Sequence, residues 1–251
     1  MKINVVWNDT GGQAIWRDGW YEPPTVKVIS DLLRPGMTFF DVGANVGQYT
    51  LLAIGLDCEV HSFEPAPAIF QFLSDNVKEM TKPAHINQCA LSDSEDTATL
   101  YIATPDNLGA TSLSKQYCHS GETFQIACTT IDNYMQKNGI AKVDAIKIDV
   151  EGAESAVLRG AEKLLSGPHR PWIVIEYEEA AQSRFGSSCA ELTKFLTAHG
   201  YRLERVTDEG VIPYTPKEPD DYTFNILARP AVAITTAAAA QRFQPSAVSL
   251  C

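Results

Sequence analysis

The sequence predicts an α/β protein whose mostly parallel sheet is covered by helices on both faces. From residue 38 onward, short apolar runs rich in Val, Ile and Phe alternate with segments of helical periodicity, which is typical of parallel sheets. Several apolar runs end in acidic residues, so those acids are expected at one edge of the sheet. The chain has 251 residues, enough for one large core or two modest ones.

The first 36 residues are expected to form an N-terminal extension that packs over the ligand crevice. Tryptophans mixed with glycines near the start indicate a short strand or hairpin. Helical spacing of Val26, Ile29, Leu32 and Leu33 then predicts a helix over residues 25–33. The Arg-Pro-Gly sequence at 34–36 ends that helix.

The next segments alternate between strand and helix. Prolines 65 and 67 open one of the helices, because proline is tolerated in a first helical turn. The expected elements are a strand at 38–42, a glycine turn at 43–47, a helix at 48–55, a strand at 59–64, a helix after Pro67, and strands at 85–91 and 97–103.

The second half of the chain continues this alternation after an irregular segment at 104–122, which is either a lid over a site or an ordinary surface loop. The last two strands lack an intervening helix, which favours an antiparallel pair at the sheet edge. An alanine-rich tail at 230–251 is expected to be flexible. The other expected elements are strands at 124–128, 143–148, 172–177, 201–206 and 222–228, and helices beginning at 129–132, at 153 and at 188.

The charge and composition exclude several function classes. Twenty basic against 31 acidic residues give 20 − 31 = −11, which argues against nucleic acid or an anionic membrane surface as the main partner. No apolar run reaches the length of about 18 residues that a membrane span needs, and the N-terminus lacks signal-peptide features. Six scattered cysteines include no CxxC pair. We therefore expect a cytoplasmic protein that acts on a small molecule.

The strongest motif is Asp41-Val-Gly-Ala-Asn-Val-Gly47, between a buried strand and a helix. Glycines allow a ligand to approach the backbone, and ligands of such sheets bind beyond the carboxyl ends of the strands. Asn45 stands where the dinucleotide fingerprint G-x-G-x-x-G has its second glycine, and no Walker lysine follows. An acid ahead of the turn repels a pyrophosphate and attracts a cation.

Further acids follow later strands. Glu64 ends the strand at 59–64, where an acid binds the ribose hydroxyls of a nucleoside. Asp149 and Glu151 end the strand at 143–148, and Glu154 is either a crevice residue or a first-turn acid that favours the helix dipole. Glu176 closes the strand at 172–177. Together these signals indicate a nucleoside cofactor without a pyrophosphate.

The stretches at 40–47, 63–65, 130–132 and 146–154 resemble the FkbM-type S-adenosylmethionine-dependent methyltransferases, and residues 19–23 resemble the segment that precedes the core in that family. The resemblance covers about residues 19–207. It implies a Rossmann-like class I methyltransferase fold, usually with seven strands of which the last is antiparallel, as a domain over 37–229. It also implies S-adenosylmethionine as cofactor and O-methylation of a sugar or other natural-product hydroxyl.

The same resemblance implies roles for individual residues. The amino-acid part of the cofactor is expected at Asp41, Gly43, Ala44, Asn45 and Gly47. Glu64 would bind the ribose, and Asp93, in the loop after the strand at 85–91, would lie near the adenine.

A hydroxyl acceptor loses a proton during methyl transfer, so a base is expected within hydrogen-bond reach. Asp149 is the first candidate and Glu151 the second, with orientation of acceptor or cofactor as their alternative role. The expected substrate-binding residues are Tyr21, Glu22, Thr111, Ser112 and Glu176. Asp149, Glu151 and Glu176 could supply oxygen ligands to Mg²⁺, but the sequence has no metal-binding signature, so we expect no metal.

Two other functions are compatible with the predicted sheet. A nicotinamide-dependent oxidoreductase would need a dinucleotide site, against which the missing glycine and Asp41 both count. A non-catalytic nucleoside-binding protein on the same fold would not need the combination of glycine turn, Glu64 and Asp149.

Overall fold

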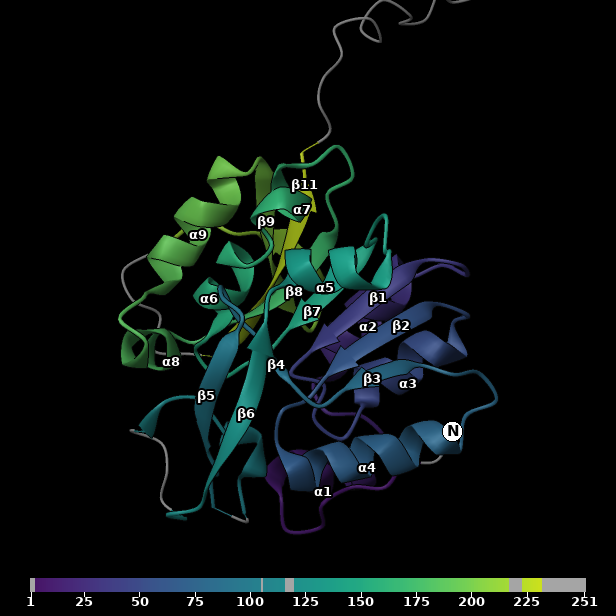
Figure 1. Ribbon diagram of the computed structural model, residues 1–251. Helices are drawn as coiled ribbons and strands as arrows, with labels where there is room; N and C mark the ends of the chain where they lie inside the picture. Colours follow the sequence, from purple (N-terminus) through teal and green to yellow (C-terminus); the bar gives the residue numbers. More distant parts are fainter. Residues whose placement is uncertain (1–2, 105, 116–119, 217–222, 232–251) are drawn as a thin grey trace, which may run out of the picture.

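Two β-sheets organise the chain in the computed structural model, which describes residues 3–104, 106–115, 120–216 and 223–231 (Figure 1). The large sheet has eight strands and the small sheet three. In spatial order the large sheet consists of β10 (Gly210–Pro213), β9 (Tyr201–Thr207), β11 (Phe224–Pro230), β8 (Trp172–Tyr177), β7 (Ala145–Ile148), β1 (Thr38–Val42), β2 (Glu59–Phe63) and β3 (His85–Asn87).

The large sheet is parallel from β3 to β8 and antiparallel beyond. β11 runs antiparallel to β8 on one side and to β9 on the other. The predicted antiparallel pair of last strands is present, but β11 lies inside the sheet and the edge is β10, which pairs with β9. The α/β fold class is confirmed, and the expected count of seven strands is wrong by one because β9 turns back into the short β10.

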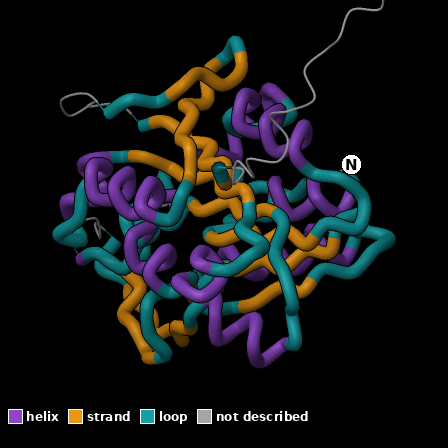
Figure 2. The backbone as a smooth tube through the Cα atoms, turned by 90° about the horizontal axis from the view of Figure 1, so that it is seen from above, coloured by secondary structure: helices purple, strands orange, loops and turns teal. Residues whose placement is uncertain are grey.

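Helices cover both faces of the large sheet, as the view from above shows (Figure 2). Strands β1 and β7 are buried along their whole length because both faces are covered. No helix in the described ranges is long and apolar enough to cross a membrane. One face packs against α2 (Pro23–Leu32) and α3 (Gln48–Gly55), with the end of α4 (Pro67–Lys78), and the other against α5 (Ile131–Asn138), α6 (Glu154–Arg159), α7 (Glu162–Ser166) and α9 (Cys189–Ala198).

The small sheet forms where one predicted strand divides. The strand expected at 85–91 splits into β3, in the large sheet, and β4 (Ala90–Leu91), which pairs with β6 (Thr123–Thr129). Strand β5 (Asp96–Tyr101) completes the small sheet on the other side of β6. Apolar side chains of this sheet pack against α1 (Thr10–Asp18) and α4, so it forms a third core beside the large sheet (Figure 1).

Two helical predictions need correction. The hairpin expected near the N-terminus is wrong, because the chain forms helix α1, whose first turn is capped by Asp9 accepting from Gly12 N at 3.0 Å. The single helix expected from 153 is two helices, because Asp132 accepts backbone N–H groups of Lys163 and Leu164 and so starts α7 separately. Residues 232–251 of the expected tail lie outside the described residues.

Candidate active site

A cavity of about 400 Å³ lies at the carboxyl edge of the parallel strands. This volume falls in the range of small-molecule sites. Three parts of the chain line it: the segments that follow the central strands, residues 9–21 of the N-terminal segment, and residues 107–113 between the strands of the small sheet. The cavity therefore lies at the edge where the sequence places its acids.

The glycine turn at 43–47 has no free backbone N–H group for an anion. Each of its five N–H groups already has an acceptor in the protein, so it does not offer the amide cradle that a pyrophosphate needs. The pairs are Gly43 N and Ala44 N to Phe63 O (3.0 and 2.9 Å), Asn45 N to Glu64 Oε2 (3.0 Å), Val46 N to Asn45 Oδ1 (2.7 Å) and Gly47 N to Ala44 O (2.8 Å).

Gly43 brings the end of β1 against the end of β7. Its φ is +80°, in the region that favours glycine, and a Cβ built on it would lie 1.8 Å from Asp149 O. No side chain fits at that distance. Gly43 therefore sets the spacing between the glycine turn and the acids that follow β7.

Glu64 is a buried carboxylate that lines the cavity. Its two oxygens accept from Asn45 N at 3.0 Å and from Ala66 N at 2.8 Å, which fixes its position after β2. Burial raises the pKa of Glu64 to about 7, against the effect of those two N–H donors. The carboxylate therefore takes up or releases a proton near neutral pH.

Asp41 lies beneath the cavity and does not line it. It is fully buried, and one oxygen accepts from Thr50 Oγ1 at 2.6 Å. The other oxygen, Oδ1, has no hydrogen-bond partner among the described residues. Burial raises the pKa of Asp41 to about 6.

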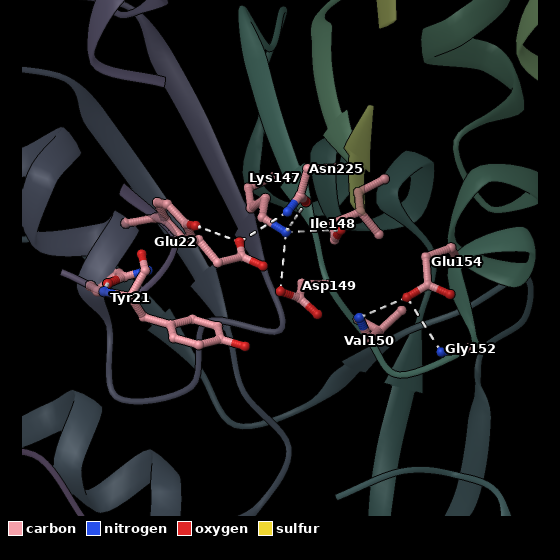
Figure 3. A network of polar contacts seen from close by, with 11 residues as sticks. Tyr21, Glu22, Lys147, Ile148, Asp149, Val150, Gly152, Glu154 and Asn225 are labelled. Carbon is pink, nitrogen blue, oxygen red and sulfur yellow. Dashed lines mark hydrogen bonds and ion pairs between the residues drawn. The ribbon is translucent and has the colours of Figure 1, made fainter. Parts of the chain in front are cut away.

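Lys147 is a fully buried cation in the middle of the apolar strand β7. Its Nζ donates to Asp149 Oδ2 and to Asn225 Oδ1, both at 3.1 Å, and Asn225 in turn donates to Glu22 Oε2 at 2.9 Å (Figure 3). Burial opposes the charged form, but the negative charges of Asp149 and Glu22 outweigh it and raise the pKa of Lys147. The ion pair holds the side chain of Asp149 at the cavity wall.

Glu151 and Glu176 face the same part of the cavity as Asp149. One carboxylate oxygen from each of the three lies within 4.8 Å of the others. Burial, together with the charge of Asp149, raises the pKa of Glu151 to about 9 and that of Glu176 well above its ordinary value. The three carboxyl groups therefore disfavour one another's ionised forms, and Lys147 pairs directly with Asp149.

Glu154 supports the turn that carries these acids. Its Oε1 accepts from Val150 N at 3.0 Å and from Gly152 N at 3.4 Å (Figure 3). Its Oε2 accepts from Gln182. It is buried, so these bonds are shielded from water. Of its two predicted roles, Glu154 therefore has that of the first-turn acid of α6, from which it also holds the turn, and it does not line the cavity.

The family model for the methyltransferase FkbM domain matches residues 41–203, which is well over half of the chain. The chain belongs to the FkbM methyltransferase family. The predicted resemblance is thus confirmed, and the protein is an S-adenosylmethionine-dependent methyltransferase.

Two curated relatives of this FkbM-family chain have described activities. It is 29% identical to the 31-O-demethyl-FK506 methyltransferase FkbM of Streptomyces tacrolimicus, over 68% of this chain and 75% of the relative. It is 24% identical to the hexuronic acid methyltransferase AglP of Haloferax volcanii, over 74% and 72%.

This family member is also similar to solved methyltransferase structures. A precorrin-6y C5,15-methyltransferase from Geobacter metallireducens matches with a TM-score of 0.48 and 13% identity, over 82% of this chain and 87% of that one. A putative methyltransferase from Streptococcus mutans in complex with SAH matches with a TM-score of 0.49 and 10% identity, over 81% and 94%.

Most of the residues predicted for the FkbM-type site line one cavity. They are Tyr21, Gly43, Ala44, Asn45, Glu64, Thr111, Ser112, Asp149, Glu151 and Glu176.

Four predicted residues do not line the cavity. Asp41 lies below it, and Gly47 precedes α3 with φ +93°. Glu22 contacts the site through Asn225 and Tyr49 Oη. Asp93 is exposed and binds the guanidinium of Arg159 at 2.8 and 3.0 Å, so its side chain is engaged elsewhere.

Sequence reasoning missed Lys147 and Asn225. Both are polar residues inside strands that are otherwise apolar, at Ala145–Ile148 and within Phe224–Pro230. A buried charged or amide side chain needs a partner, so this pattern is itself a signal of a polar network.

Proposed function

We propose that this methyltransferase transfers a methyl group from S-adenosylmethionine to a hydroxyl oxygen of a sugar or other small natural product. The observation that carries the proposal is the carboxyl group of Asp149 on the cavity wall, beside the glycine turn and 3.1 Å from Lys147 Nζ. The names of two relatives support the acceptor class, since one acts on 31-O-demethyl-FK506 and the other on a hexuronic acid.

The residues around the cavity suit a cationic nucleoside. The glycine turn lacks free N–H groups, which disfavours a pyrophosphate and so a nicotinamide dinucleotide. The acids at the carboxyl edge favour a positive charge. Glu64 is placed to accept hydroxyl hydrogen bonds from a ribose, and the backbone of residues 43–45 leaves room for the amino-acid part. When bound, the cofactor supplies a methyl group on a positively charged sulfur.

The role of Asp149 is to accept the proton that the acceptor hydroxyl loses. Its side chain lines the cavity, and the contact with Lys147 fixes its position there. Glu151 is the second candidate, but a pKa of about 9 leaves it largely protonated at neutral pH in the cofactor-free protein. Glu151 then orients the acceptor by donating a hydrogen bond.

The N-terminal extension, residues 1–36, is proposed as a cap on the methyltransferase domain at 37–229. Tyr21 is joined to α3 by two hydrogen bonds, from Tyr21 N to Gln48 Oε1 (2.9 Å) and from Gln48 Nε2 to Tyr21 O (3.0 Å). Asp9 Oδ1 accepts from Gly109 N at 3.3 Å, which links α1 to the loop that carries Thr111 and Ser112. The acceptor would bind between these segments and Glu176.

The test is methyl transfer with purified protein and S-adenosylmethionine carrying an isotopically labelled methyl group. The acceptors are a hexuronic acid, a neutral hexose, a macrolide alcohol, an amine and a thiol. We expect label in an O-methyl ether of at least one hydroxyl acceptor, identified by mass spectrometry and NMR. Label transferred to the amine or thiol alone would overturn the proposal.

A further inference from the structure

The three carboxylates of Asp149, Glu151 and Glu176, called here the acidic triad, come from the ends of two neighbouring strands. Ile148 of β7 pairs with Ile175 of β8, so Asp149 and Glu176 follow the last paired residues side by side. One oxygen of each triad residue lies within 4.8 Å of the other two. Two oxygens bound to the same Mg²⁺ lie about 3 to 4.2 Å apart, so small side-chain movements bring the triad onto one ion.

Glu176 gives the strongest argument that the triad binds a ligand. Its side chain is 9% exposed, it lines the cavity, and its carboxylate accepts no hydrogen bond from any residue in the described ranges. The carboxylate of Glu151 is likewise without a hydrogen-bond donor there, since Ser112 binds only the Glu151 carbonyl. Burial without partners disfavours the ionised form of a carboxyl group, and a bound cation stabilises that form.

The positive charges near the triad are already engaged. Lys147 donates to Asp149 and to Asn225, on the side of the network that faces Glu22 (Figure 3). Arg184 forms an ion pair with Glu178 at 3.4 Å. The triad therefore combines three carboxylates with one shared ammonium group at the wall of a cavity.

We propose that the acidic triad binds one divalent cation that prefers oxygen ligands, of the Mg²⁺ or Mn²⁺ type. The absence of His or Cys in the triad disfavours softer metals. This proposal departs from the expectation of no metal, which followed from the lack of a metal-binding signature in the sequence.

A second group of possible ligands, Glu59, His61 and His85, does not have the geometry of a metal site. The rings of His61 and His85 are stacked, with centroids 4.5 Å apart and planes 11° apart. Lone pairs of imidazole nitrogens lie in the ring plane, so two stacked rings cannot direct them to one ion. This group provides the control for binding elsewhere on the protein.

The chemical role of the cation rests on the proposed O-methylation. A cation that binds the acceptor oxygen lowers the pKa of the hydroxyl, as divalent metals do for bound water. The O–H bond breaks and its proton passes to a triad carboxylate oxygen that does not bind the cation, and then to water. The new O–CH₃ bond forms as the S–CH₃ bond breaks, which leaves S-adenosylhomocysteine.

The experiment measures Mn²⁺ binding to the full chain after treatment with EDTA, by electron paramagnetic resonance of free Mn²⁺. We expect about one Mn²⁺ per chain, displaced by Mg²⁺, and an affinity reduced by about tenfold or more in Glu176→Gln and in Glu151→Gln. Both variants replace a carboxyl group that accepts no hydrogen bond in the described residues with an amide of similar size, so they should fold, which thermal unfolding checks. Glu59→Gln should bind Mn²⁺ like the wild type.

Three results would overturn the cation site: no Mn²⁺ binding at millimolar concentration, binding that Glu176→Gln and Glu151→Gln leave unchanged, or binding that Glu59→Gln removes. Calorimetry with S-adenosylhomocysteine and the labelled-methyl assay, both in EDTA, separate this proposal from the function. Undiminished O-methylation in EDTA would contradict the role of the cation and leave the function standing. Label on amine or thiol acceptors alone would contradict the function, whatever the Mn²⁺ result.

Discussion

Asp149 is the residue on which the proposed proton transfer depends most directly. We expect Asp149→Asn to lower turnover by about 10²- to 10⁴-fold, because the amide cannot accept the proton of the acceptor hydroxyl. Binding of S-adenosylhomocysteine should change little, since Glu64 and the glycine turn remain. The matched control is Glu178→Gln, which removes an acid at the end of the neighbouring strand β8. Near-wild-type turnover in Asp149→Asn would exclude it as the base.

Glu64 should make cofactor binding depend on pH. A ribose hydroxyl donates best to the ionised carboxylate, and its pKa in the ligand-free protein is about 7. The affinity for S-adenosylhomocysteine should therefore weaken as the pH falls through 7, by up to about tenfold per pH unit. Calorimetry between about pH 6.5 and 8 measures this effect above the range where Asp41, with its pKa of about 6, titrates.

A change of pH should have the opposite effect on the stability of the ligand-free protein. The pKa of Glu64 is raised from an ordinary value of 4.5, so its contribution to stability is present below that pH and is lost as the pH rises through 7. Glu64→Gln should bind the cofactor product more weakly and reduce both dependences. An unchanged pH profile of binding in Glu64→Gln would assign the effect to another group.

At the scale of elements, the contact between the glycine turn and the end of β7 is the tightest backbone approach in the site. Gly43→Ala would place a Cβ 1.8 Å from Asp149 O at a φ of +80°, so the two segments must separate. We expect the free energy of unfolding in urea to fall by at least about 1–3 kcal/mol, and S-adenosylhomocysteine to bind more weakly. Gly55→Ala, at the end of α3, has no atom within 4 Å of the new Cβ and should be neutral or slightly stabilising.

Equal unfolding midpoints for Gly43→Ala and Gly55→Ala would contradict the prediction that no side chain fits between Gly43 and Asp149 O.

The central elements were predictable because their own sequences determine them. Strands β1 and β7 are buried on both faces, so they are apolar throughout, and helix starts carry recognisable residues such as Thr130, which caps α5. The small sheet was not predictable, because a strand's pattern does not say which sheet it joins. The chain leaves the large sheet after Asn87 and joins β6 at Ala90, without any change in its apolar pattern.

The site was predictable to the extent that it follows from strand ends. Asp149 and Glu176 were placed together because parallel strands end at one edge. Asp93 could not be excluded from sequence, since its partner Arg159 is 66 residues away. Lys147 and Glu22 are likewise coupled through Asn225, over 200 residues along the chain from Glu22. Such contacts depend on the tertiary fold and leave no local pattern.

At the scale of the whole molecule, the net charge of −11 is partly concentrated at one place. Glu22, Glu64 and the acidic triad lie in or beside a single cavity, where Lys147 is the buried cation among them. Such a distribution attracts a cationic nucleoside and repels free anionic metabolites such as phosphates. Part of the acidity of the chain is therefore explained by the site.

The buried side-chain amide of Asn76 is one of the groups that link the N-terminal segment to the rest of the molecule. Asn76 of α4 accepts from Asn4 N at 2.6 Å and donates to Asn4 O at 2.9 Å and to Val46 O at 2.7 Å. It joins the segment that carries α1 to the glycine turn, so it couples the proposed cap to the cofactor site. Removing it leaves backbone groups of Asn4 and Val46 without partners.

We therefore expect Asn76→Ala to destabilise the protein by about 1–3 kcal/mol and to speed amide hydrogen exchange over residues 3–22 more than elsewhere. Because the segment lines the cavity, S-adenosylhomocysteine should restore part of the protection. The control is Gln71→Ala on the same helix, whose side chain bonds only to the exposed Asp75. If exchange over residues 3–22 were the same in both variants, the N-terminal segment would be held by apolar packing of α1 and not by Asn76, and the coupling between cap and cofactor turn would have to run through Tyr21 and Gln48 instead.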